Sequence, residues 1–176
     1  MRFLVISLLC GAAILDSGCF FLNRGGERGR VMDKWEASGQ TFKIRVTEYE
    51  EKNPVMLTKF FYVFDSSSVG SNEWYEIAAI RTDDDIPIPT TQIRFVDSET
   101  GFFFMIYDYA VTTNEGHKWS VWNAQRDLTD WQNHRTFIKD VKIGTNGAGI
   151  MSLEPFDKRE NPTILKTSDF GQHWSS

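Results

Sequence analysis

The chain has 176 residues, of which 41% are hydrophobic and 14% aromatic, which is enough for one domain with its own core. Its formal net charge is -5 at pH 7, with acidic and basic residues mixed along the chain. This balance excludes the basic surface that nucleic-acid binding requires, and it argues against docking on anionic lipid by charge alone.

Residues 1–18 have the pattern of a secretory signal peptide. Arg2 gives a positively charged start, an apolar run extends from Phe3 to Leu15, and small residues precede Cys19. An apolar run of this length is too short to span a membrane and is typical of a segment removed on export. We therefore predict that the mature chain begins at or near Cys19.

Residues 17–19 (SGC) resemble a bacterial lipobox, in which the cysteine receives a lipid and becomes the mature N-terminus. Asp16 stands where that pattern prefers an apolar residue, so ordinary signal-peptide cleavage is the alternative. Cys10 lies in the segment to be removed, which leaves Cys19 without a disulfide partner. The resemblance implies a lipoprotein that faces the periplasm, and Phe20 is similar to the sorting signal for the outer membrane.

The remaining chain predicts a tether followed by one all-β domain. Residues 19–34 contain glycine and no apolar period, which is typical of a flexible linker. In the segment 41–49 (TFKIRVTEY), apolar and polar residues alternate with the period of a half-buried strand. Two further strands are predicted at 55–64 and 74–80, and the domain extends from residue 35 to the end of the chain.

Two segments of the chain are repeated. The sequence at 92–104 aligns with that at 140–152, and the octapeptide TTNEGHKW (112–119) aligns with TSDFGQHW (167–174). Each unit therefore reads strand, turn ending in glycine, two strands, octapeptide and strand, as stacked β units do. Residues 41–80 would form a degenerate first unit, and three units do not easily close a propeller of four to eight blades. The domain is therefore an open propeller-like stack or sandwich, or it closes with another chain.

Each octapeptide has the composition of a tight turn. An Asn or Asp side chain accepts hydrogen bonds from backbone N–H groups one or two residues ahead, glycine supplies a positive φ, and tryptophan packs its ring over the turn. The octapeptides resemble Asp-boxes, the S/T-x-D-x-G-x-x-W hairpins of β-propellers such as sialidases. That resemblance implies antiparallel hairpin units in an open propeller-like or sandwich arrangement, without an activity of their own. The residues with this structural role are Thr112, Asn114, Gly116, Trp119, Thr167, Asp169, Gly171 and Trp174.

The sequence contains no recognisable catalytic constellation. His117, His134 and His173 are its only histidines, and none has the spacing of metal ligands. The consecutive residues Asp83, Asp84 and Asp85 lack the alternate spacing of a calcium loop, and the prolines that follow suit an exposed connector. We predict no catalytic residue, metal or cofactor, with a small hydrolase using two carboxylates as the alternative.

Mixed polar and aromatic residues around 122–134 can serve as a binding surface, although such aromatic side chains more often lie in the core. The leading hypothesis is a non-catalytic envelope lipoprotein that binds another protein. Its layout is similar to that of immunity lipoproteins that neutralise periplasmic toxins. A carbohydrate or cell-wall binding module and a propeller-like assembly factor are the alternatives. The candidate partner-binding residues are Trp122, Trp131, His134, Asp83, Asp84 and Asp85, and the best helical window is 123–133.

Overall fold

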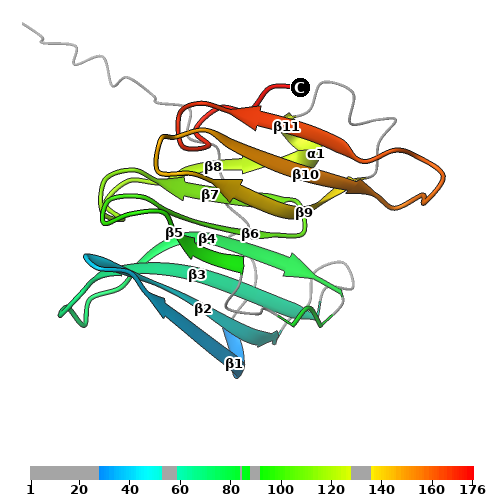
Figure 1. The fold of residues 1–176 in the computed structure, drawn as a ribbon. Coiled ribbons are helices and arrows are strands. Elements are labelled where there is room, and N and C mark those ends of the chain that lie inside the picture. The colour runs from blue at the N-terminus through cyan, green and yellow to red at the C-terminus, as the bar shows by residue number, and fades with distance from the viewer. Residues whose placement is uncertain (1–27, 53–58, 84, 88–91, 128–135) are drawn as a thin grey trace, which may run out of the picture.

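The computed structural model describes residues 28–52, 59–83, 85–87, 92–127 and 136–176. The predicted signal peptide, Cys19 and the first part of the tether lie outside these ranges. The described strands are antiparallel and pair with their neighbours in the sequence, in three sheets that stack in chain order (Figure 1). The prediction of an all-β, antiparallel fold is confirmed.

Each sheet takes consecutive strands. The first contains β1 (Arg28–Ser38), β2 (Phe42–Glu51), β3 (Phe60–Ser68) and β4 (Tyr75–Thr82). The middle sheet contains β5 (Ile93–Phe95), β6 (Gly101–Met105), β7 (Asp108–Thr112) and β8 (Ser120–Asn123). The third contains β9 (Thr136–Ile143), β10 (Gly149–Pro155) and β11 (Thr163–Thr167).

The single helix of the described ranges is α1 (Ala124–Asp127), which lies inside the predicted window. No helix in the described part of the chain is long and apolar enough to cross a membrane.

Strand β1 is not indicated by the sequence pattern. Residues 28–34 fall in the predicted tether, but they pair with β2, from Arg28 opposite Glu51 to Lys34 opposite Thr47. Nine of the eleven residues of β1 are exposed, because the strand lies at the edge of its sheet and has one neighbour. An edge strand of this kind has no apolar alternation to reveal it.

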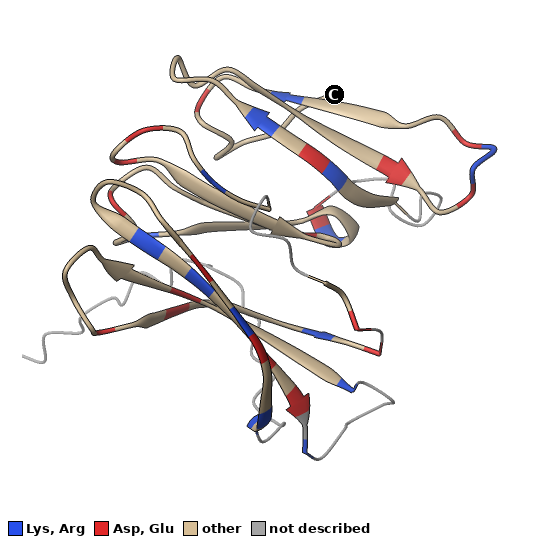
Figure 2. Cartoon of the chain, turned by 60° about the horizontal axis from the view of Figure 1, so that its bottom comes forward, with Lys and Arg blue, Asp and Glu red and all other residues tan. Residues whose placement is uncertain are grey.

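The middle sheet is covered on both faces. Every residue of β6 and β7 is buried. Phe103 and Met105 contribute to a core shared with the first sheet, whereas Phe102 and Phe104 contribute to a core shared with the third. Since both faces are apolar, these strands read as a continuous hydrophobic run rather than an alternating one. Basic and acidic residues follow the strands of the outer sheets instead (Figure 2).

The two predicted repeat units have the same strand register. In the middle sheet Phe95 pairs with Gly101, which pairs with Thr112. In the third sheet Ile143 pairs with Gly149, which pairs with Thr167. Each octapeptide therefore begins at the same register position, at a threonine that pairs with a glycine of the preceding strand.

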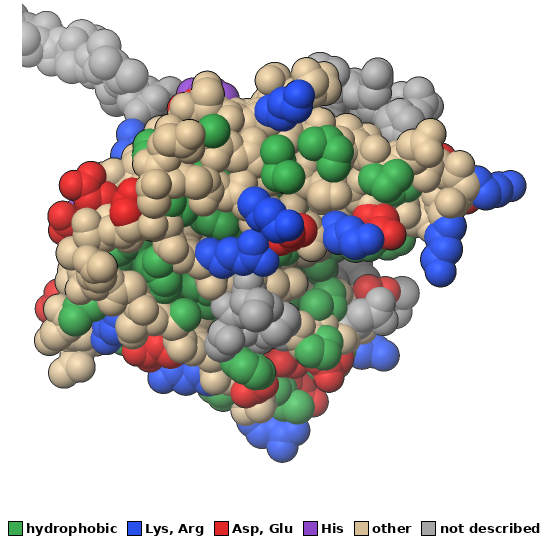
Figure 3. All heavy atoms as spheres, viewed as in Figure 1, with side chains coloured by type: hydrophobic (Ala, Val, Ile, Leu, Met, Phe, Trp, Pro, Cys, Tyr) green, Lys and Arg blue, Asp and Glu red, His purple; other side chains and the backbone are tan. Residues whose placement is uncertain are grey.

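The two outer faces of the stack carry different kinds of side chain. On the first sheet, the Trp74 ring lies 4.0 Å from the guanidinium of Arg45, which also forms an ion pair with Asp65 at 2.6 Å. On the third sheet, Ile150 and Ile164 are 44% and 45% exposed. Exposed hydrophobic side chains lie next to basic ones over this sheet (Figure 3).

Candidate functional site

The first octapeptide forms a turn closed by its own side chains. The Thr112 hydroxyl donates to Asn114 Oδ1 at 2.8 Å and accepts from the Gly116 N–H at 3.1 Å. The same Asn114 oxygen accepts from the Lys118 N–H, four residues ahead, at 2.9 Å. The Trp119 indole N–H donates to the Gly116 carbonyl at 2.9 Å. These bonds occupy the side chains of Thr112 and Asn114 within the turn itself.

The second octapeptide repeats the hydrogen bonds of the threonine and the acidic side chain, but within the described residues the Trp174 indole N–H has no partner. The Thr167 hydroxyl donates to Asp169 Oδ1 at 2.7 Å and accepts from the Gly171 N–H at 3.0 Å. The His173 N–H donates to Asp169 Oδ1 at 3.1 Å, and the His173 ring nitrogen lies 2.6 Å from Asp169 Oδ2. Burial opposes ionisation of Asp169, but the bonds from Thr167 and His173 outweigh it and lower the pKa to about 2.

The hydrogen bonds of Thr112, Asn114, Thr167 and Asp169 therefore lie within the two turns. A groove of about 530 Å³ lies at the opposite end of the strands from the octapeptides. We call it the end groove. Its lining comes from β4 and the segment after it, the β6–β7 turn and the end of β10. The lining residues are Ala79, Ile80, Arg81, Thr82, Asp83, Ile86, Ile106, Tyr107, Asp108 and Phe156.

Aromatic side chains from two sheets meet at the end groove. The ring of Phe156 lies 6.2 Å from that of Tyr107 and 5.4 Å from that of Phe137, measured between centroids. Phe156 is nevertheless 53% exposed. A large ring that is held by two aromatic neighbours and still faces solvent resembles the anchors of protein interfaces.

The turn that presents Tyr107 is strained. Ile106 has φ of +53°, a region that β-branched residues rarely enter. Two contacts hold it there: the Ile106 carbonyl accepts from the Ile138 N–H at 2.6 Å, and the Tyr107 carbonyl accepts from the Ala124 N–H at 2.7 Å. Such strain costs about 1–3 kcal/mol and is found mostly at functional sites. The surrounding sheets thus fix the position of Tyr107 at the groove.

A buried carboxyl group lies at the base of the end groove. Asp108 is 5% exposed, and its Oδ1 accepts from the Asn123 side-chain amide at 2.6 Å. Burial raises the Asp108 pKa to about 6, against the opposing effects of Asn123 and of Arg126. Ionisation of this carboxyl group is therefore shifted towards neutral pH, in a groove that Arg81 and Asp83 also line.

The predicted partner-binding residues are distributed unevenly around this groove. Asp83 lines it. Asp85 is exposed beside it. Trp122 is half-buried in the second core, where its strand partner is Tyr109. Asp84, Trp131 and His134 lie outside the described residues.

Phe156, Ile106 and Tyr107 line the groove but are not among the predicted partner-binding residues. Phe156 follows β10 in a charged loop, and only the folded chain brings it to Tyr107. Ile106 and Tyr107 separate two apolar strands, so the pair could have been read as a two-residue hairpin turn. Within the described ranges, no group of three or more His, Cys, Asp or Glu side chains is placed to hold a metal ion.

Comparison with protein-family models, with curated proteins and with solved structures gives no match to this chain.

Proposed function

We propose that this chain is a non-catalytic binding protein whose end groove holds a protein partner. The exposed ring of Phe156, supported by Tyr107 and Phe137 at the mouth of an apolar groove, is the observation that carries the proposal. Interface hot spots are typically aromatic anchors with charged residues at the rim. Arg81 and Asp83 supply charge of both signs at this groove.

We further propose that the protein is exported and anchored through a lipid on Cys19, facing the periplasm. The basis is the signal-like pattern of residues 1–18 and the lipobox-like residues 17–19. A small anchored protein with one partner-binding groove has the layout of an immunity protein that neutralises a periplasmic toxin. A propeller-like assembly factor would use the same groove for a resident envelope protein, and the identity of the partner distinguishes the two.

For the architecture, we propose an open, propeller-like stack of Asp-box units. The shared register of the middle and third sheets and the common hydrogen-bond scheme of the octapeptides support this proposal. The alternative of cell-wall glycan binding by Trp122 and Trp131 has less support, because Trp122 is half-buried in the second core.

The proposal is tested by affinity capture from an envelope extract of the cells that make the protein. The full chain is compared with Phe156→Ala at the end groove and with Tyr75→Ala at the opposite end, where an exposed tyrosine provides a matched control. We expect one protein to be captured by wild type and by Tyr75→Ala, and at least tenfold less of it by Phe156→Ala. Equal capture by all three proteins would contradict the assignment of the end groove.

A further inference from the structure

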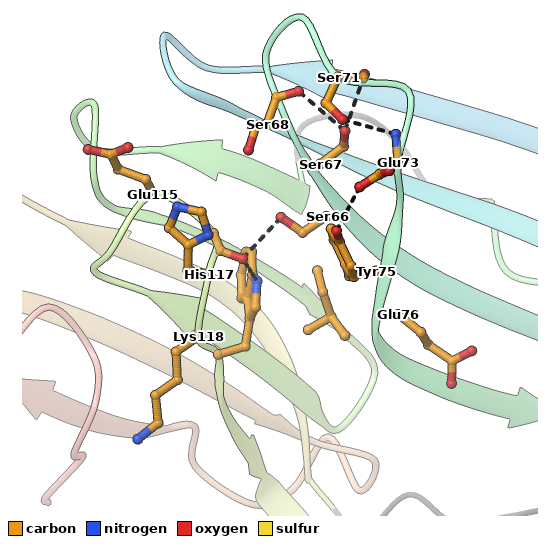
Figure 4. Close-up of a pocket in the computed structure, with 13 residues that line it drawn as sticks. Ser66, Ser67, Ser68, Ser71, Glu73, Tyr75, Glu76, Glu115, His117 and Lys118 are labelled. Carbon is orange, nitrogen blue, oxygen red and sulfur yellow. Dashed lines mark hydrogen bonds between the residues drawn. The ribbon is translucent and has the colours of Figure 1, made fainter.

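A second groove lies beside the first octapeptide, between the first and middle sheets. It has a volume of about 660 Å³ and is called here the serine groove. Side chains from the β3–β4 turn form one wall, and side chains from the octapeptide stand on the other (Figure 4). Its lining residues are Ser66, Ser67, Ser68, Ser71, Glu73, Tyr75, Glu76, Ile77, Glu115, Gly116, His117, Lys118 and Trp119.

The serine groove lies at a junction where a serine stands in the place that a tyrosine takes at the other junction. At the junction of the middle and third sheets, a Cβ atom on Gly171 would overlap the hydroxyl of Tyr109, so the tyrosine fills the space under the second octapeptide. At the equivalent place under the first octapeptide, a Cβ atom on Gly116 would lie 2.6 Å from Ser66 Oγ. The two junctions thus have the same turn but different side chains beneath it, Tyr109 in one and Ser66 with Phe42 in the other.

Hydrogen bonds preform the serine wall. The Ser66 hydroxyl donates to the Gly116 carbonyl at 3.4 Å, which links the two walls at the base. The Ser71 hydroxyl oxygen accepts from the Glu73 N–H at 3.0 Å. The Tyr75 hydroxyl donates to Glu73 Oε2 at 2.9 Å, and the Tyr75 ring remains 66% exposed. This arrangement holds a flat aromatic face in place at low entropic cost.

The opposite wall offers unused polar groups of several kinds. Within the described ranges, the side chains of Glu115, His117 and Lys118 have no hydrogen-bonding or ion-pair partner, and all three are exposed. They supply a carboxylate acceptor, an imidazole that both donates and accepts, and an ammonium donor. A neutral ligand with many hydroxyl groups can use all of these, since each hydroxyl both donates and accepts.

We propose that the serine groove binds a short neutral glycan, with an apolar sugar face on the Tyr75 ring and the sugar hydroxyls hydrogen-bonded to the two walls. The volume lies within the range of about 300–1,000 Å³ typical of small-molecule sites. A lysine-rich peptide fits less well, because Lys118 lies on one wall and Glu76 is already paired with Arg28. This site is separate from the end groove and does not depend on a protein partner.

The test is calorimetric titration of the full chain with the neutral oligosaccharides maltotriose, cellotriose and triacetylchitotriose, and with tetralysine as a cationic probe. We expect saturable binding of at least one oligosaccharide. Tyr75→Ala should weaken that binding at least tenfold, whereas Tyr75→Phe, which keeps the ring, should weaken it less than threefold. Phe156→Ala removes a comparably exposed ring at the opposite end and should leave it unchanged.

Three results would overturn the proposal. These are no saturable binding of any of the oligosaccharides, equal weakening by Tyr75→Ala and Phe156→Ala, and binding of tetralysine in place of the sugars. Because position 75 is exposed, unchanged melting temperatures of the variants will separate a loss of binding from a loss of fold.

Discussion

Replacing Gly116 by alanine should destabilise the protein for two separable reasons. Gly116 has φ of +81°, where a Cβ atom costs about 1–2 kcal/mol. That atom would also lie 2.6 Å from Ser66 Oγ and 3.0 Å from the Phe42 ring, both on the first sheet. Displacing packed neighbours typically costs a further ~1–3 kcal/mol. The total is then about 2–5 kcal/mol.

Gly70 provides the matched control for this prediction. It has φ of +85°, but a Cβ atom there would meet nothing within 4 Å. Gly70→Ala should therefore lower the free energy of unfolding only by the cost of a Cβ atom at positive φ, about 1–2 kcal/mol. Urea unfolding followed by tryptophan fluorescence measures both free energies of unfolding. Thermal melts should place Gly116→Ala about 2–12 °C below Gly70→Ala, at roughly 2–4 °C per kcal/mol for a domain of this size.

If both glycine variants lose the same free energy of unfolding, the reasoning is refuted. The first octapeptide would then not pack against β3 and β2, and the base of the serine groove would have a different geometry.

Three other substitutions test the core, the buried carboxyl group and the second turn. Phe103→Ala removes a fully buried ring stacked 4.0 Å from that of Phe64 and should lower the free energy of unfolding by about 3–5 kcal/mol; a loss under 1 kcal/mol in urea titrations would place this ring outside the core. The Asp108 pKa is raised to about 6 in the folded protein, so as the pH falls the native state takes up this proton before the unfolded state does. Wild-type stability should consequently gain up to about 3 kcal/mol from this group between pH 6 and 4. Asp108→Asn should lack that gain, and parallel pH profiles would contradict the assignment. Thr167→Val removes the hydroxyl that joins Gly171 and Asp169 and should cost about 1–3 kcal/mol. Carboxyl NMR should then show the Asp169 pKa rising from about 2, and an unchanged pKa would exclude the bond.

The strands that pack on one face were the easiest to predict from the sequence. In β2, Phe42, Ile44 and Val46 are fully buried in the first core, and these are the residues whose alternation indicated the strand. The sequence pattern does not indicate edge strand β1, because exposure on both faces leaves no periodic signal. The repeat was visible because equivalent strands need glycine at the same register position.

The grooves could not be predicted in the same way. The end groove requires Asp83, Tyr107 and Phe156. These residues lie next to strands of three different sheets and come together only when the sheets stack. The serine groove depends on the difference between Ser66 and Tyr109 beneath equivalent turns. The sequence repeat aligns the turns but does not show which residue of the preceding sheet lies under each one.

Site-specific photo-crosslinking tests the central claim, that the end groove holds a protein partner, most directly. A photoreactive phenylalanine analogue is placed at Phe156 in one version of the full chain and at Tyr75 in another, and both are irradiated in the cells that make the protein. The account predicts one defined protein adduct from position 156 and none from position 75. An adduct from position 75 alone, or no adduct from position 156, would contradict it.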